Sequence, residues 1–200
     1  MTRIGIVLFD GVEELDFVGP WEVFTMAAKL KPDAGIEVRT VSKEGGPVRC
    51  AKGLRVTPDG GFSDAPRFNI LLVPGGEGRK REMNDERMLS WLRARSAEAT
   101  WNTSVCTGAF LLHGAGLLAG RRATTHWSAV DELRTRAGKE LTVVEDVRFV
   151  RDGNVVTASG VSAGIDMALW LVGQVWDPAF ARQVQRHMEY NPAPPYTAEV

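Results

Sequence analysis

The stretch Arg3-Ile4-Gly5-Ile6-Val7-Leu8-Phe9, followed at once by Asp10-Gly11, is the part of the sequence that decides the fold class. It is short, continuous and rich in branched apolar side chains, which is typical of a strand buried on both faces of a sheet. Asn69-Ile70-Leu71-Leu72-Val73 has the same character and is closed by Pro74-Gly75-Gly76. Both runs therefore indicate inner strands of a mostly parallel sheet.

Segments with helical spacing alternate with these strands. The pattern predicts helices from near Gly19-Pro20 to Lys29 and from Thr107 onward, and further helices over 85–99, 128–136, 162–175 and 177–189. It predicts additional strands over 36–41, 101–105, 122–127, 143–151 and 154–158, hairpin-like excursions over 45–61, and a hairpin turn at Asp152-Gly153. The alternation predicts a doubly wound α/β fold with helices on both faces of the sheet. We expect one domain, 1–200, that ends in a Pro-rich tail at 190–200.

Composition excludes several classes of protein. The 24 basic and 25 acidic residues leave a net charge of −1, which argues against a nucleic-acid partner. No apolar stretch is long enough to span a bilayer. The apolar run that precedes Asp10 is too short for a secretory leader. Two cysteines, Cys50 and Cys106, form no disulfide framework. We therefore expect a cytoplasmic globular protein.

The sharpest functional feature is Ser104-Val105-Cys106-Thr107-Gly108, where a predicted strand runs into a predicted helix. Small residues around one nucleophile at such a junction are the pattern of a nucleophile elbow. The N–H groups at the start of the helix are expected to favour the thiolate of Cys106. The alternative is a buried cysteine that packs as a small hydrophobe. The position favours function for Cys106, whereas Cys50, in a loop, is assigned the structural alternative.

Two glycines at another strand end, Gly75 and Gly76, allow backbone N–H groups to approach a ligand closely. Together with the N–H of Thr107, the N–H of Gly76 is a candidate for an oxyanion-type hole beside Cys106. The alternative is a simple turn. The segment is not a phosphate loop, because neither G-x-x-x-x-G-K-[ST] nor G-x-G-x-x-G occurs in the chain.

Acidic residues follow the first strand in Glu13-Glu14-Leu15-Asp16. They either complement the N-terminus of the next helix or bring one carboxyl group to Cys106 for proton transfer, and the spacing alone favours neither. A carboxyl group close to a thiolate would have a raised pKa.

The remaining candidates are weaker. His126 ends a predicted strand and is a candidate base or orienting group in the same site. Three scattered histidines, without C-x-x-C or H-E-x-x-H, predict no metal site. Arg79-Lys80-Arg81 is interpreted as a solvated loop rather than as an attractor for an anionic substrate.

The sequence resembles the ThiJ/PfpI superfamily, whose members are class I glutamine amidotransferase-like proteins. The resemblance covers nearly the whole chain. The resemblance is strongest to the isonitrile (isocyanide) hydratases. It is carried by LFDGVEELDFVGP at 8–20, VPGG at 73–76, SVCTG at 104–108, GLLAGRRATTHW at 116–127 and EYNPAPP at 189–195.

The resemblance implies a flavodoxin-like fold, Cys106 as the nucleophile and Asp16 as its acid/base partner. It also implies that backbone around Gly76 and Thr107 lines the pocket, that no metal or organic cofactor is needed, and that the protein is a homodimer. We expect Gly75 and His126 to belong to the same pocket. The implied reaction converts an isocyanide to an N-formamide through a thioimidate on Cys106. Peptidase members carry His after the cysteine, and Thr107 at that position argues against peptidase action.

Two alternatives remain open. The chain also resembles the ligand-sensing half of AraC-type regulators, which suggests a non-catalytic module that binds a small ligand or registers oxidation of Cys106. The other alternative is a different thiol hydrolase or lyase that uses His126 as a base. Glu77 departs from the pattern by adding a charge after the two glycines.

Overall fold

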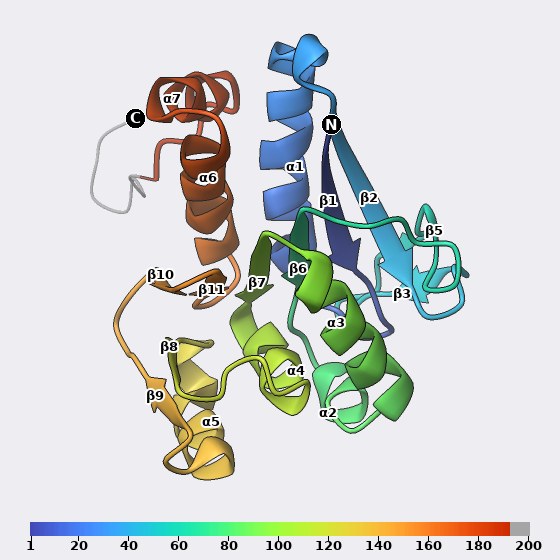
Figure 1. Ribbon diagram of the computed structural model, residues 1–200, viewed down its shortest axis with the longest axis vertical. Coiled ribbons are helices and arrows are strands. Elements are labelled where there is room, and N and C mark those ends of the chain that lie inside the picture. Colours follow the sequence, from blue (N-terminus) through green and yellow to red (C-terminus); the bar gives the residue numbers. More distant parts are fainter. Residues whose placement is uncertain (193–200) are drawn as a thin grey trace.

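The computed structural model describes residues 1–192, and a seven-stranded sheet lies at its centre (Figure 1). The strand order is β10-β11-β7-β6-β1-β2-β5, and every neighbouring pair is parallel except the antiparallel pair β10–β11. Two small sheets accompany it, one with antiparallel β3 and β4 and one with parallel β8 and β9. The strands are β1 (Thr2–Val7), β2 (Ile36–Ser42), β3 (Val48–Arg49), β4 (Arg55–Val56), β5 (Gly60–Gly61), β6 (Ile70–Val73), β7 (Trp101–Val105), β8 (Arg121–Ala123), β9 (Leu141–Val143), β10 (Phe149–Asp152) and β11 (Val155–Ala158).

Helices cover both faces of the large sheet. Helices α1, α6 and α7 pack together on one side, and α3 and α4 pack together on the other (Figure 1). The helices are α1 (Glu14–Leu30), α2 (Arg79–Glu82), α3 (Glu86–Glu98), α4 (Ala109–Gly114), α5 (Val130–Ala137), α6 (Ala163–Val175) and α7 (Pro178–His187), with 3₁₀ turns η1 (Pro32–Ala34), η2 (Cys106–Gly108) and η3 (Trp127–Ala129). This arrangement confirms the predicted doubly wound α/β fold.

The inner strands are as buried as their sequences predict. All four residues of β6 have no exposed surface, and the same holds for Ile4, Ile6 and Val7 of β1. Burying one such side chain is worth about 1.5–3 kcal/mol, so these two strands form much of the core. Gly5 is required by packing, because a Cβ atom there would lie 2.5 Å from the ring of Phe68.

The carboxyl ends of the parallel strands meet at one edge of the sheet. After β1 the chain turns to β2 on one side, whereas β6 and β7 lie on the other side of β1. Ligands of open α/β proteins bind at such a reversal, outside the carboxyl ends of the strands. The segments that follow β1, β6, β7 and β11 therefore supply the candidate site.

The first helix begins earlier than the sequence predicts. It starts at Glu14, so Pro20 lies within the helix rather than at its first positions. The acidic residues Glu14 and Asp16 occupy the first turn, where the helix dipole favours negative charge. The Pro20 ring packs against α6, where a Cβ on Gly164 would lie 3.2 Å from it.

Other boundaries also differ from the prediction. Strand β8 ends at Ala123, before His126, and the predicted strand over 143–151 is two strands, β9 and β10, separated by a loop in which Asp146 has φ +54°. The hairpin at Asp152-Gly153 is confirmed, and the segment 45–61 contains the predicted hairpin as β3–β4. Of the expected Pro-rich tail, residues 193–200 lie outside the described part of the chain.

Candidate active site

Asp16 is a buried carboxyl group in the first turn of α1. It has no exposed surface, and its Oδ2 accepts a hydrogen bond of 2.9 Å from the N–H of Gly75. Its Oδ1 is buried without a hydrogen-bond partner among residues 1–192. Burial raises the pKa of Asp16 from 3.8 to about 7, and the charge of Glu13 acts in the same direction. Asp16 can therefore gain or lose a proton near neutral pH.

Cys106 lies at the junction between β7 and η2, next to Asp16. Its backbone is left-handed, with φ +56°, which is uncommon for a residue other than glycine and is often found at functional sites. Two hydrogen bonds hold this conformation. The Cys106 N–H donates to the Ser159 carbonyl (2.6 Å), and the Cys106 carbonyl accepts from the Thr125 hydroxyl (2.9 Å). Cys106 is 7% exposed, and its thiol lies near enough to the Asp16 carboxyl group for each to shift the pKa of the other.

Burial and the negative charge of Asp16 raise the pKa of the Cys106 thiol to about 12. Hydrogen bonds from the backbone of Thr107 and of Val161 act in the other direction. The contribution expected from the start of the helix is thus present, but burial outweighs it. The resting form of Cys106 is the neutral thiol, and its proton must leave as the sulfur reacts.

The two glycines after β6, Gly75 and Gly76, stand where the backbone is too crowded or too strained for a side chain. A Cβ atom on Gly75 would lie 2.5 Å from the backbone nitrogen of Thr107, and Gly76 has φ +118°. The N–H of Gly75 donates to Asp16, and the N–H of Gly76 donates to the Thr107 hydroxyl (3.0 Å). The suggested oxyanion-type pair of Gly76 and Thr107 stays a prediction, and in this structure the Gly76 N–H has the Thr107 hydroxyl as its acceptor. The backbone groups that contact the sulfur belong to Thr107 and Val161.

Cys106 opens into a cleft of about 310 Å³. Of the predicted site residues, Gly76, Thr107 and His126 line it together with Cys106, whereas Asp16 and Gly75 do not. The remaining lining residues are Glu13, Ala51, Glu77, Arg79, Lys80, Ser128, Ala129, Glu132 and Val161. His126 is held by a 2.8 Å contact between its Nδ1 and the Ser128 hydroxyl.

The cleft contains residues that sequence reasoning missed. Val161 has φ +46°, a strained conformation for a β-branched residue, and contacts Cys106 through its backbone. No local pattern marks it, because its position depends on how β11 pairs with β7. Arg79, interpreted as solvated, is only 6% exposed and pairs with Glu132.

The other cysteine and the other two histidines lie outside the cleft. Cys50 is buried, and burial raises the pKa of its thiol to about 11. His113 and His187 do not line the cleft. Within residues 1–192, no group of three or more His, Cys, Asp or Glu side chains is arranged to hold a metal ion.

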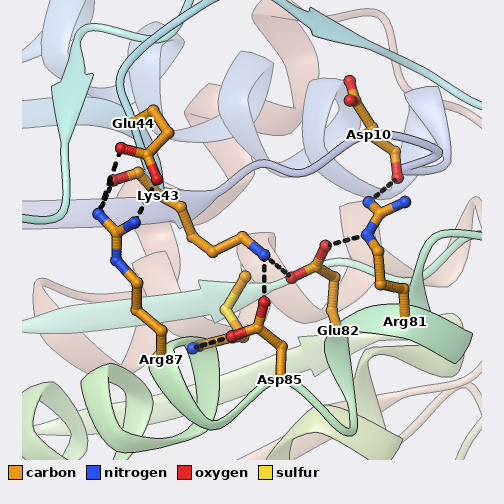
Figure 2. Close-up of polar contacts among 8 residues, drawn as sticks. Asp10, Lys43, Glu44, Arg81, Glu82, Asp85 and Arg87 are labelled. Carbon is orange, nitrogen blue, oxygen red and sulfur yellow. Dashed lines mark hydrogen bonds and ion pairs between the residues drawn. The ribbon is translucent and has the colours of Figure 1, made fainter.

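A charged network supports the loop that precedes Asp16 (Figure 2). Arg81 donates to the backbone carbonyl of Asp10 (3.0 Å) and to the buried Glu82 (2.8 Å). Lys43 pairs with Glu82 (2.9 Å) and with Asp85 (2.5 Å). Because the network joins the segments after β1 and β2 to α2 and α3, it fixes the start of the loop that leads into α1.

Comparison with known proteins places this arrangement in a family. The model of the DJ-1/PfpI family matches residues 2–174. The chain belongs to the DJ-1/PfpI family. It is similar to the isonitrile hydratase of Pseudomonas putida, with 43% identity over 97% of this chain and 81% of that protein. It is also similar to the HTH-type transcriptional regulator CdhR of Pseudomonas aeruginosa, with 32% identity over 89% of this chain but only 52% of the regulator.

Solved structures give the same result for this DJ-1/PfpI chain. The crystal structure of a ThiJ/PfpI family protein from Pseudomonas syringae matches with a TM-score of 0.88 and 33% identity, and the alignment covers all of this chain and 79% of that one. The flavodoxin-like fold that the sequence resemblance implied is thereby confirmed. Among residues 1–192, none of the helices combines the length and the apolar character needed to cross a membrane.

Proposed function

We propose that this protein is a cysteine-dependent hydratase that converts isocyanides to N-formamides, with Cys106 as nucleophile and Asp16 as acid and base. The observation that carries the proposal is the buried contact between the Cys106 thiol and a carboxyl group whose pKa is about 7. Such a carboxyl group can accept a proton and return it at neutral pH. The identity of 43% to an isonitrile hydratase supports isocyanides as the substrate class.

In the first half-reaction, the sulfur attacks the terminal carbon of the isocyanide. The S–C bond forms while the thiol proton passes to Asp16, whose Oδ1 has no other partner among the described residues. Asp16 then delivers this proton to the former isocyanide carbon, which gives a thioimidate, R–N=CH–S–Cys106. Backbone N–H groups of Thr107 and Val161 stabilise the negative charge on sulfur during the attack.

In the second half-reaction, water attacks the thioimidate carbon. The Asp16 carboxylate takes one proton from the water and passes it to the imine nitrogen as the C–O bond forms. Asp16 then takes the remaining hydroxyl proton and delivers it to the sulfur as the C–S bond breaks, which releases the N-formamide. The sum is one isocyanide plus one water, and the enzyme is unchanged.

Formamide production from an aryl isocyanide, followed by absorbance, tests this function. We expect turnover by the wild type, none by Cys106→Ala, and a rate lowered about 10²- to 10⁴-fold in Asp16→Asn. Cys50→Ala is the matched control, because Cys50 is a buried cysteine outside the cleft, and it should retain turnover. No turnover by folded wild-type protein would refute the hydratase proposal.

A ligand-sensing module is the second candidate function. The similarity to the regulator CdhR favours it, since the chain spans about half of that protein. A sensor predicts ligand binding that shifts the melting temperature without consuming the ligand. If the protein is instead a different thiol-dependent hydrolase or lyase with His126 as base, turnover should be lost in His126→Gln. The hydratase proposal predicts only a modest effect of the same substitution.

We also propose that the protein works as a cytoplasmic homodimer without a metal or organic cofactor. The sequence resemblance supports the homodimer and the absence of a cofactor, and the composition supports the cytoplasm. Two large apolar side chains of α1, Leu15 and Trp21, are 38% and 39% exposed, which supports the dimer alone. Sedimentation equilibrium tests the dimer, and a monomer at micromolar concentration would contradict it.

A further inference from the structure

An ion pair joins the two walls of the cleft. Arg79 begins α2, after the loop that contains Gly75 and Gly76, and Glu132 lies on α5, after the segment that contains His126. The guanidinium group contacts both carboxylate oxygens, with Nη1–Oε1 at 2.8 Å and Nη2–Oε2 at 2.5 Å. Both residues line the cleft that holds Cys106.

The two partners differ in how firmly they are fixed. Arg79 is 6% exposed, and its guanidinium group lies 4.0 Å from the centre of the Phe110 ring. The Glu132 side chain is 49% exposed. The cation is therefore part of the cleft wall, whereas the carboxylate covers it from the solvent side. Removing a partner from a buried charge is costly, so an uncovered Arg79 would attract another anion.

The neighbouring pair, Lys80 and Glu77, provides a contrast in the same cleft. Its side chains are 64% and 80% exposed, and they form a single contact of 3.0 Å. Water screens such a pair, so losing the carboxylate changes little for a ligand. Glu77 and Glu132 carry the same charge. They differ in their partners, because Lys80 is exposed whereas Arg79 is buried.

We propose that Glu132 determines the charge selectivity of the cleft: by covering Arg79 it keeps an anion site closed, so that the cleft admits neutral substrates and discriminates against those with a carboxylate. The substrate part of this inference rests on the proposed hydratase function. The charge selectivity itself concerns any reagent that reaches Cys106 through the cleft, so it can be measured without turnover.

Alkylation of Cys106 by two reagents of similar size tests the selectivity directly. Iodoacetate is anionic and iodoacetamide is neutral, and with either one an S–C bond forms and iodide leaves. The intrinsic reactivities of the two reagents cancel when the ratio of the iodoacetate to the iodoacetamide rate constant is compared between variants, so the change in this ratio reports on charge. In Glu132→Gln we expect this ratio to rise about tenfold, because Arg79 then offers a charge-assisted hydrogen bond to the carboxylate. The gain should shrink at high ionic strength. Peptide mass spectrometry assigns the modification to Cys106 rather than Cys50.

Two variants separate selectivity from other effects. Glu77→Gln removes the same formal charge from the same cleft, and its ratio should change less than about twofold. Glu44→Gln breaks another bidentate pair, with Arg87 (Figure 2), whose residues do not line the cleft, and should leave the ratio unchanged. An unchanged ratio in Glu132→Gln, or equal shifts in Glu132→Gln and Glu77→Gln, would overturn the proposal. The double variant Arg79→Gln/Glu132→Gln should lose the gain.

Hydration of an isocyanide that carries a carboxylate, compared with that of its amide, extends the test to catalysis. Glu132→Gln should raise the ratio of kcat/KM for the anionic over the neutral substrate by about tenfold. If neither substrate reacts with the wild type, the hydratase proposal fails while the alkylation ratio still decides the role of Glu132. If both react and the ratio is unmoved, the selectivity proposal fails alone.

Discussion

Replacing Asp16 with asparagine should raise the stability of the variant relative to the wild type increasingly as the pH rises. The carboxyl group has no exposed surface, and its pKa is raised from 3.8 to about 7 in the folded state. The folded protein therefore binds this proton more tightly than the unfolded chain does. Stability is lost as the pH rises from about 4 to about 7, and the loss is complete above that range. Asparagine keeps an oxygen for the Gly75 N–H but carries no charge.

The size of the effect follows from the pKa. At about 1.4 kcal/mol for each pH unit, burying the Asp16 carboxylate costs about 4 kcal/mol at pH 8 and above, and roughly 1.5–2 kcal/mol near pH 5. The free energy of unfolding of Asp16→Asn should thus exceed that of the wild type by about 2–3 kcal/mol more at pH 8 than at pH 5. The buried amide adds a constant to both values, which cancels in this difference.

Urea denaturation followed by circular dichroism at the two pH values measures this difference. The thiols are kept reduced, so that Cys106 chemistry does not interfere. Asp33→Asn is the matched control, because it makes the same substitution at an exposed aspartate outside the site. A difference between Asp16→Asn and the wild type that stays constant with pH, or that falls as the pH rises, would refute the assignment of a raised pKa to Asp16.

Two further substitutions test the scaffold around the site. Gly108→Ala should abolish the native fold or destabilise it by about 3 kcal/mol or more, because the new Cβ would lie 2.0 Å from the Val73 carbonyl oxygen; a melting temperature equal to that of the wild type would contradict this. Glu82→Gln should lower the free energy of unfolding by about 1–3 kcal/mol, because it removes a buried negative charge that pairs with Lys43 and Arg81. An unchanged urea midpoint would show that the network around Glu82 adds no stability.

The inner strands were predictable because a short continuous run of apolar residues by itself indicates burial on both faces of a sheet. Continuous apolar runs such as Ile70-Leu71-Leu72-Val73 have few alternatives to an inner parallel strand. The start of α1 was missed because proline is favoured at the beginning of a helix, whereas Pro20 lies inside α1 and packs against α6. The local rule for helix starts failed at this position.

In the site, too, the features set by local sequence were predicted and those set by contacts between distant residues were not. Cys106 stood out because a nucleophile between a strand and a helix is a local pattern. The sequence left open whether an acidic residue after β1 faces the cysteine; the structure buries Asp16 there, next to the thiol. The Arg79–Glu132 pair joins residues far apart in the chain, so no spacing rule could reveal it.

Mass spectrometry of the intact protein during a single turnover tests the central claim most directly. On mixing wild-type protein with an aryl isocyanide, we predict a transient mass increase equal to the whole isocyanide, located on the peptide that contains Cys106, which decays as formamide accumulates. Asp16→Asn should slow both phases, and Cys106→Ala should show neither the adduct nor the product. Formamide production by Cys106→Ala at the wild-type rate would contradict the account.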